Sequence, residues 1–305
     1  MSGPTGDVGA PGRGAAGRGA AGRAGPLRVC IVTNGSWFAT LALDRLLTRT
    51  ATRHAYLVVV ATGLRKQSGN RLVEASRLLH RWGLRYFAYK MAVNVLPSVL
   101  GRVIPGRPSI GRICRGLGVP TARFRNVNDA QPKDRIRQFG PDLLISFSCP
   151  NRLSADVLAL PTIGSLNVHS SLLPAYAGMA GYIHALRNDD PYTGVTVHEM
   201  VERLDAGRIV RQQRIVIQPK MSVFQLFRDQ CLWGAALLEE AIDDCATTGR
   251  IDGSPQDLAQ RTWVGEPTRD DIRVLRRRGF RLMGFRDLVE LVRPPGPNRE
   301  IGARS

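Results

Sequence analysis

The sequence predicts an α/β fold in which a mostly parallel sheet carries helices on both faces. Three features support this class. Short apolar runs recur along the chain, as expected of strands that are buried on both faces. Stretches with apolar residues at helical spacing separate these runs and produce repeated strand–helix–strand units. Several helical stretches end at a glycine, which is a common helix terminator.

The first predicted unit comprises a strand at residues 27–33, a helix at 37–49 and a strand at 54–62. Residues 64–113 then carry apolar side chains at helical spacing, interleaved with arginines and aromatics, and predict two amphipathic helices inserted into the α/β pattern. Three interpretations of this insertion are open. In the first, its apolar face covers the sheet. In the second, this face binds an anionic membrane surface or a partner, and in the third it forms a wall of the substrate pocket.

The strand–helix alternation continues beyond this insertion. The predicted elements are a helix at 109–118, a strand at 118–124, a helix at 129–140, a strand at 141–148, a helix at 153–160, strands at 164–174, 193–201 and 208–217, and a long helix at 222–245. In the last part of the chain, Thr268 is expected to begin a helix as its N-cap, because Asp271 follows three residues later as in a capping box.

The composition divides the chain into four regions. The Gly/Ala/Arg-rich start lacks the apolar stretch of a signal peptide and is expected to be disordered. The predicted organisation is a disordered tail at 1–26, a main domain at 27–245 with the helical insertion at 64–113, a small C-terminal appendix at 246–293 and a disordered tail at 294–305.

The charge of the chain is strongly basic, with 43 Lys and Arg against 25 Asp and Glu and a formal net charge of +18. Such an excess attracts nucleic acids, anionic membrane surfaces and phosphorylated substrates. The basic residues are spread over the N-terminal tail, residues 65–125 and residues 269–286, and no block forms a nucleic-acid-binding motif. We therefore expect no specific nucleic-acid partner, and at most weak association of the basic insertion with anionic surfaces.

The cysteines and the hydropathy pattern exclude further classes. The five cysteines form no CxxC pair, which argues against a zinc site and a disulfide framework and favours a reducing cytoplasm. The most apolar later run is broken by Pro97 and is shorter than the ~20 residues that cross a bilayer. No transmembrane segment is expected.

Asn167 and His169 are the first candidates for chemistry. Side chains alternate along a strand, so these two residues point to the same side, at a strand end where parallel sheets place their ligands. Asn can donate to a developing oxyanion, and His can donate a hydrogen bond or exchange a proton near neutral pH. The structural alternative is a loop Asn beside a hydrogen-bonded His.

Asp205 is the second candidate. It precedes Gly207 between two predicted strands, where an ordinary Asx turn is one interpretation. A carboxylate that orients the imidazole and takes up a proton from an amine is the other.

Together these stretches resemble the signature of the formyltransferase family, over residues 140–215 most clearly and over 27–245 more broadly. The matching residues are Asn167, His169, Ser171, Leu172, Leu173 and Pro174, then Thr196, Val197 and His198, then Leu204, Asp205 and Gly207. The separation of 38 positions between Asn167 and Asp205 also agrees with the family. The resemblance fades within residues 64–113 and after residue 250.

The resemblance implies a Rossmann-like catalytic domain, 10-formyltetrahydrofolate as co-substrate and no metal. It implies that Asn167 and His169 stabilise the oxyanion while Asp205 helps to deprotonate the acceptor amine. Related enzymes hold the pterin of the folate against segments that correspond here to residues 146–153 and 201–207. The expected folate contacts in these segments are Ser148, Pro150, Asn151, Leu153, Val201 and Leu204.

Contacts with the acceptor are expected in three parts of the chain. Residues 34–36 match the phosphate-binding turn of glycinamide ribonucleotide formyltransferase, and a plain tight turn is the alternative. The expected acceptor contacts are Asn34, Gly35, Ser36, Ser171, Tyr176, Gly178 and His198. A hydrogen-bonded structural role is the alternative for His198.

The resulting hypothesis is a cytoplasmic N-formyltransferase that acts on a small amine: an amino sugar, an amino acid or a peptide or natural-product intermediate. A methionyl-tRNA formyltransferase-like enzyme and a 10-formyltetrahydrofolate hydrolase are the alternatives. The loop after Pro174 reads AYAG without the arginine usual in the tRNA enzymes, and the chain beyond Cys245 is short for their C-terminal tRNA-binding barrel. The basic charge keeps tRNA as an alternative partner, and homodimer formation is left open.

Overall fold

The computed structural model describes residues 25–63, 71–103 and 108–292. The predicted tails at 1–26 and 294–305 lie outside these residues, apart from residues 25 and 26. The strands are β1 (Arg28–Thr33), β2 (Ala55–Ala61), β3 (Thr121–Phe124), β4 (Leu143–Phe147), β5 (Gly164–His169), β6 (Ala177–Gly178), β7 (Tyr192–Glu199), β8 (Ile209–Val216) and β9 (Trp263–Val264).

The helices separate these strands along most of the chain. They are α1 (Trp37–Thr50), α2 (Arg71–Asn94), α3 (Leu96–Val103), α4 (Ile110–Gly116), α5 (Ala130–Phe139), α6 (Ala155–Leu158), α7 (Gly181–Asn188), α8 (Val223–Thr248), the short 3₁₀ helix η1 (Leu258–Gln260), α9 (Arg269–Arg277) and α10 (Phe285–Val292). Thr268 caps α9 in a capping box with Asp271, as the sequence predicts.

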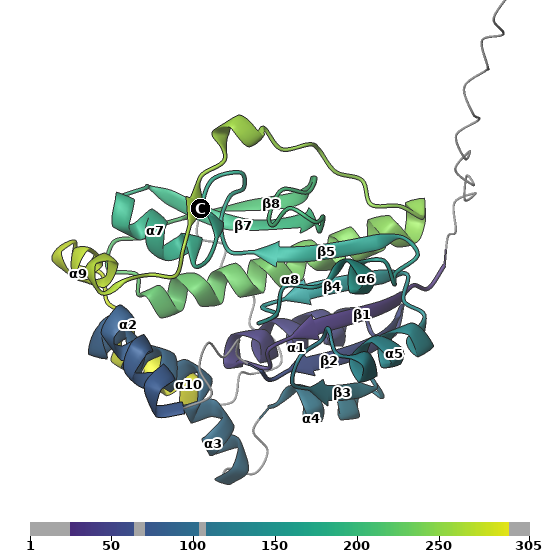
Figure 1. Cartoon of the computed structure of the whole chain (residues 1–305), viewed down its shortest axis with the longest axis horizontal. Coiled ribbons are helices and arrows are strands. Elements are labelled where there is room, and N and C mark those ends of the chain that lie inside the picture. The colour runs from purple at the N-terminus through teal and green to yellow at the C-terminus, as the bar shows by residue number, and fades with distance from the viewer. Residues whose placement is uncertain (1–24, 64–70, 104–107, 293–305) are drawn as a thin grey trace, which may run out of the picture.

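A seven-stranded sheet in the order β3-β2-β1-β4-β5-β7-β8 forms the centre of the described residues (Figure 1). The pairs among β1 to β5 are parallel, whereas β7 pairs antiparallel with both β5 and β8. The predicted mostly parallel α/β fold is confirmed. The strand order reverses between β1 and β4, and parallel sheets bind their ligands beside the carboxyl ends of strands at such a switch point.

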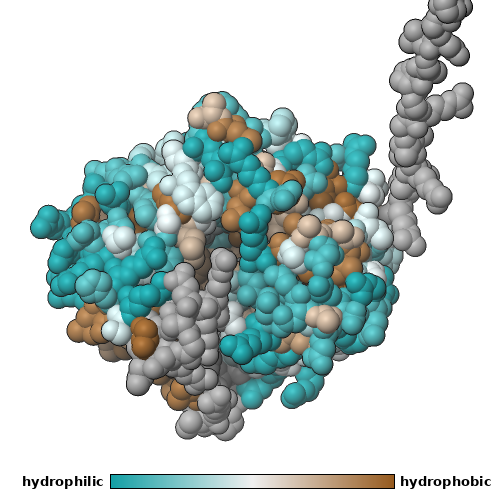
Figure 2. Space-filling view, viewed as in Figure 1, coloured by the Kyte–Doolittle hydropathy of each residue, from teal (hydrophilic) through white to brown (hydrophobic). Residues whose placement is uncertain are grey.

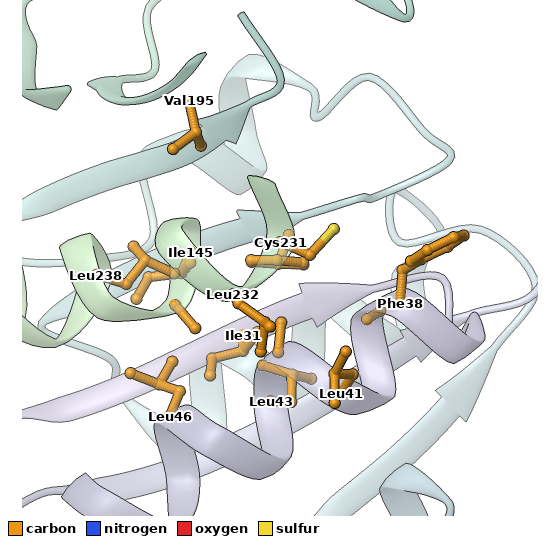
Figure 3. Close-up of a cluster of buried hydrophobic side chains, with 14 of the residues drawn as sticks. Ile31, Phe38, Leu41, Leu43, Leu46, Ile145, Val195, Cys231, Leu232 and Leu238 are labelled. Atoms are coloured by element: carbon orange, nitrogen blue, oxygen red, sulfur yellow. The ribbon is translucent and has the colours of Figure 1, made fainter. Parts of the chain in front are cut away.

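Two apolar cores cover the two faces of the sheet. The larger core joins the sheet to α1 and α8, and Figure 3 shows Ile31 and Ile145 of the strands beside Leu43 of α1 and Leu238 of α8. The smaller core packs Leu144 of β4 against residues from the α5 and α6 side, including Ile136. The strands are therefore apolar on both faces, which explains the continuous apolar runs in the sequence.

The helical insertion contributes to the larger core through one face of α2. Tyr86, Tyr89 and Val93 are buried there, while Leu84 on the same helix is 72% exposed. Helix α2 bends at Gly83, where the backbone adopts a positive φ. Figure 2 shows a mainly hydrophilic surface with separate apolar patches, one of them at the lower left where α2 lies. The insertion thus covers part of the core and also presents apolar side chains to solvent.

The C-terminal region packs against the same larger core. Ile251, Ile272, Leu275 and Leu291 are buried in it. In Figure 1, α9, α10, α2 and α3 gather at one end of the sheet. Among the described residues, no helix is long and apolar enough to cross a membrane.

Candidate active site

Strand β5 brings Asn167 and His169 to the carboxyl-end edge of the sheet. Leu166 is fully buried in the larger core, and Val168 packs against that core. Because side chains alternate along a strand, Asn167 and His169 lie on the other face. The apolar partners of β5 therefore fix the direction of both polar side chains.

The pairing of β5 with β7 adds His198 to the site. Asn167 lies directly opposite His198 in the antiparallel register, and its Nδ2 is 3.1 Å from Nε2 of His198. Nδ1 of His198 lies 2.8 Å from the Glu199 carbonyl oxygen, so Nδ1 carries the proton and donates it. Nε2 of His198 is then an acceptor, and one N–H of the Asn167 amide donates to it. The second N–H of this amide remains available to a ligand.

Asp205 lies in the loop between β7 and β8 with a positive φ of 52°, a conformation that Asp adopts more readily than most residues. The loop requires Gly207, because a Cβ at that position would lie 1.9 Å from the Glu199 carbonyl oxygen. Oδ2 of Asp205 accepts a hydrogen bond of 2.8 Å from the Gly178 N–H. This contact holds the carboxylate against β6.

Two imidazole nitrogens lie near the free oxygen of this carboxylate. Oδ1 of Asp205 lies 3.6 Å from Nδ1 of His169 and 3.6 Å from Nε2 of His198, which is beyond hydrogen-bond distance. Nε2 of His169 lies 3.0 Å from the Tyr176 carbonyl oxygen and must donate its proton there, so Nδ1 of the neutral ring is bare. Oδ1 of Asp205 and Nδ1 of His169 are therefore open to a ligand N–H or O–H, whereas Nε2 of His198 already accepts from the Asn167 amide.

The protonation states follow from burial and charge. Burial lowers the pKa of His169, against the attraction of Asp205, and keeps the imidazole neutral at pH 7. Burial opposes ionisation of Asp205, but His198, His169 and the Gly178 N–H outweigh it and lower the pKa of Asp205 to about 2. The site therefore pairs an ionised carboxylate with an uncharged imidazole that can accept a proton.

The loop after β5 is fixed by hydrogen bonds within the chain. Oγ of Ser171 donates to the Ala175 carbonyl oxygen at 2.9 Å, and Oγ1 of Thr196 donates to the Ser171 carbonyl oxygen at 2.7 Å. The hydroxyl of Tyr176 donates to Asp190 at 2.6 Å. Ser171 and Tyr176, which we expected to contact the acceptor, thus shape this loop through the same polar atoms.

The C-terminal region reaches the site, which the sequence did not indicate. Nε2 of Gln256 donates to the carbonyl oxygens of Asp205, at 3.1 Å, and Gly207, at 2.6 Å. Arg261 donates to the Leu204 carbonyl oxygen at 3.0 Å. Strand β9 pairs with β6, which contains Gly178. Hydrogen bonds from Gly178 of β6 and from Gln256 and Arg261 of the C-terminal region therefore hold the loop that carries Asp205.

A cavity of about 550 Å³ lies next to this loop. Its walls come from residues 152–155, 158–159 and 200–202, which overlap the two segments expected to hold the pterin. Of the expected folate contacts, Leu153 and Val201 line this cavity. Leu204 is 42% exposed on the loop, and the Asn151 side chain accepts from the Val127 N–H at 3.3 Å. Ser148 lines a second, smaller cavity. Pro150 lies between Ser148 and Asn151 in the chain.

The turn at residues 34–36 is stabilised by local hydrogen bonds at the start of α1. The Asn34 side chain accepts from the Ser36 N–H at 2.9 Å, and Oγ of Ser36 accepts from the Ala39 N–H at 3.3 Å. Gly35 has a positive φ of 68°. Two of the N–H groups that could bind a phosphate are thus hydrogen-bonded within the turn.

The described residues show no candidate metal site. Within residues 25–63, 71–103 and 108–292, no cluster of three or more His, Cys, Asp or Glu side chains is placed to hold a metal ion.

Two solved structures of known proteins are similar to this chain. Glycinamide ribonucleotide transformylase 1 from Symbiobacterium toebii is similar over 72% of this chain and 88% of its own length, with 18% identity and a TM-score of 0.50. A sugar N-formyltransferase from a Shewanella species covers 79% of this chain and 77% of its own, with 14% identity and a TM-score of 0.49. The Symbiobacterium structure shows a shared fold.

The family assignment depends on the sequence match. The sequence model of the formyl transferase family matches residues 28–231, which include β1 to β8, the Asn167/His169 strand and the Asp205 loop. The resemblance found in the sequence is confirmed. This chain belongs to the formyl transferase family and is an enzyme of the class that transfers formyl groups.

Proposed function

We propose that the protein is a cytoplasmic N-formyltransferase that moves a formyl group from 10-formyltetrahydrofolate to a small amine. The observation that carries the proposal is the pair of open acceptors, Oδ1 of Asp205 and Nδ1 of His169, which lie 3.6 Å apart. An amine nitrogen presents N–H donors to such a set of acceptors and must lose a proton when it forms an amide.

The size of the large cavity supports its assignment to the pterin part of the folate. Its volume of about 550 Å³ lies within the range of ordinary ligand pockets. The apolar residues Leu153, Leu158 and Val201 are among those that line it. We assign the pterin to this cavity, which places the folate beside the Asp205 loop.

The proposed transfer starts from a neutral His169 and an ionised Asp205. The amine nitrogen forms a bond to the formyl carbon and releases a proton to Nδ1 of His169, whose positive charge Asp205 then stabilises. The free N–H of Asn167 and the protonated His169 donate to the oxygen that gains negative charge. The bond between the formyl carbon and N10 breaks, the proton passes to N10, and the products are a formamide and tetrahydrofolate.

One assay tests this function against its alternatives. Purified protein is incubated with 10-formyltetrahydrofolate and with amino sugars, amino acids, simple amines or methionyl-tRNA, while tetrahydrofolate and formate are measured. Amine-dependent tetrahydrofolate formation without formate supports the proposal. Formate release that needs no amine would assign a hydrolase, and turnover with methionyl-tRNA alone would assign the tRNA enzyme.

A further inference from the structure

The second half of α2 carries apolar side chains on two opposite faces. The inner face is buried in the larger core and consists of Tyr86, Tyr89 and Val93. The outer face is exposed and consists of Leu84, Ala88, Met91 and Val95, which we call the outer stripe. The Val95 N–H donates to the Met91 carbonyl oxygen at 2.8 Å, so the helical turn continues past the end of α2. Spacings of four, three and four positions place the outer stripe on one side of the helix.

The exposure of the outer stripe is unusual for a surface helix. Leu84 is 72% exposed, Met91 43% and Val95 41%. A surface helix normally presents polar residues on the side opposite the core. Single exposed apolar residues are common, but a continuous apolar stripe marks an interaction surface. Figure 2 shows apolar surface at the lower left, where α2 lies in Figure 1. A partner that excludes water from the outer stripe would therefore be favoured.

The charge around the outer stripe is entirely positive. Residues 75–100 contain Arg77, Arg81, Arg85 and Lys90 but no Asp or Glu. The three arginines are exposed. An apolar stripe with basic neighbours is typical of helices that lie in the interface of a bilayer, where anionic headgroups cover an apolar layer. The charge of this segment therefore complements an anionic lipid surface.

A second copy of this chain fits the outer stripe less well than an anionic surface does. In a two-fold dimer, the same stripe of both copies would meet. Two positive segments would then come together, and residues 75–100 provide no carboxylate to pair with Arg81 or Arg85. Like charges that meet in this way oppose association.

We propose that the outer stripe binds an anionic membrane surface. Leu84, Met91 and Val95 lie at the boundary between headgroups and acyl chains, and Arg81 and Arg85 lie beside the negative charges of the headgroups. Each arginine near such a surface strengthens binding about fivefold, and burial of the stripe adds to this. The inference is independent of the proposed function, because it depends on α2 and not on the site around Asp205.

Co-sedimentation of the full chain with vesicles tests this surface. The vesicles contain phosphatidylcholine alone or phosphatidylcholine mixed with phosphatidylserine. The stripe variant is Leu84→Ser/Met91→Ser, and its matched control, Val216→Ser/Leu258→Ser, changes two exposed apolar residues on β8 and η1. We expect the stripe variant to bind phosphatidylserine vesicles at least about tenfold more weakly than the wild type, and the control to bind like the wild type.

A second pair of variants separates the outer stripe from the general positive charge of the chain. Arg81→Gln/Arg85→Gln should weaken binding about twentyfold, because both arginines flank the stripe. Arg115→Gln/Arg123→Gln removes the same charge at exposed positions of α4 and β3 and should weaken binding less than about threefold. Melting temperatures check that all variants fold.

Three results would overturn the inference. The first is that the wild type does not bind phosphatidylserine vesicles, and the second is equal binding within either matched pair. The third is a wild-type dimer, seen by sedimentation velocity, that dissociates in the stripe variant, because this would assign the outer stripe to a second copy of the chain.

Discussion

Asn167 and His198 form a cross-strand pair in which the Asn167 amide donates to Nε2 of His198 at 3.1 Å. Nε2 can accept because the Glu199 carbonyl oxygen holds the proton of the ring on Nδ1. The pair fixes the orientation of the Asn167 amide and leaves its second N–H for the substrate oxygen. His198 therefore acts by positioning Asn167.

Replacing His198 should lower the rate of transfer without unfolding the chain. In His198→Phe the Asn167 amide loses its partner, and we expect kcat to fall about 100-fold, the size of effect seen when one oxyanion donor is lost. His198→Gln should recover part of the rate because its side-chain oxygen can accept. His54→Phe, buried far from the site beside Asp243, is the control. Wild-type kcat in His198→Phe would remove this residue from the mechanism.

The pH dependence of kcat/KM should report His169. Burial lowers its pKa below the usual 6.5, and the transfer requires the neutral ring. Because only the uncharged amine attacks, kcat/KM is expressed per concentration of uncharged amine. We expect this value to stay level as the pH falls from 8 to about 6.5 and to decline only at lower pH, where His169 gains a proton. A decline that begins above pH 7 would contradict a lowered pKa.

Asp205 should stabilise the fold at neutral pH. Its folded pKa of about 2 lies below the value of 3.8 expected when unfolded, so its contribution is present above about pH 4 and is lost as the pH falls towards 2. Urea unfolding of wild type and Asp205→Asn should therefore differ more at pH 7 than at pH 3. An equal difference at both pH values would contradict the assignment.

Gly207 should be essential for the shape of the Asp205 loop. A methyl group there would lie 1.9 Å from the Glu199 carbonyl oxygen, so Gly207→Ala must displace backbone. We expect a loss of about 2 kcal/mol or more in unfolding free energy, together with lower activity. Gly265→Ala is the matched control, because a methyl group at Gly265 meets nothing within 4 Å. Thermal unfolding of the two variants provides the comparison, and equal melting temperatures would refute the prediction.

The C-terminal region should support catalysis through Gln256. Gln256→Ala removes two hydrogen bonds to the Asp205 loop, and we expect kcat to fall about tenfold through misplacement of the carboxylate. Gln260→Ala, which removes only an exposed hydrogen bond to Asp257, should leave kcat unchanged. Steady-state kinetics at saturating folate distinguishes these outcomes. Identical kcat values in both variants would show that the region is dispensable for the site.

The strands and the Asn167/His169 pair could be predicted because their signals are local. Apolar runs mark strands that are buried on both faces, and alternation alone places two residues of one strand on one side. The same alternation in β7 places Thr196 and His198 on one face, so the sequence held a signal for His198. Its partner, however, depends on the register between β5 and β7, which no local pattern encodes.

The contacts of the C-terminal region could not be predicted from such patterns. Gln256 is 51 residues from Asp205, and Arg261 is 57 residues from Leu204. These hydrogen bonds join side chains to backbone carbonyls, which every residue has, so residue types do not reveal the pairing. The same holds for β9, a two-residue strand whose partner β6 is equally short.

Transfer of an isotope-labelled formyl group tests the central claim most directly. Protein, 10-formyltetrahydrofolate with a ¹³C formyl carbon and a primary amine are mixed, and the amine product is analysed by mass spectrometry. We expect the label in a formamide with wild-type protein, and a rate about 1,000-fold lower in His169→Ala at unchanged melting temperature. Label transfer by His169→Ala within twofold of the wild-type rate would contradict the account.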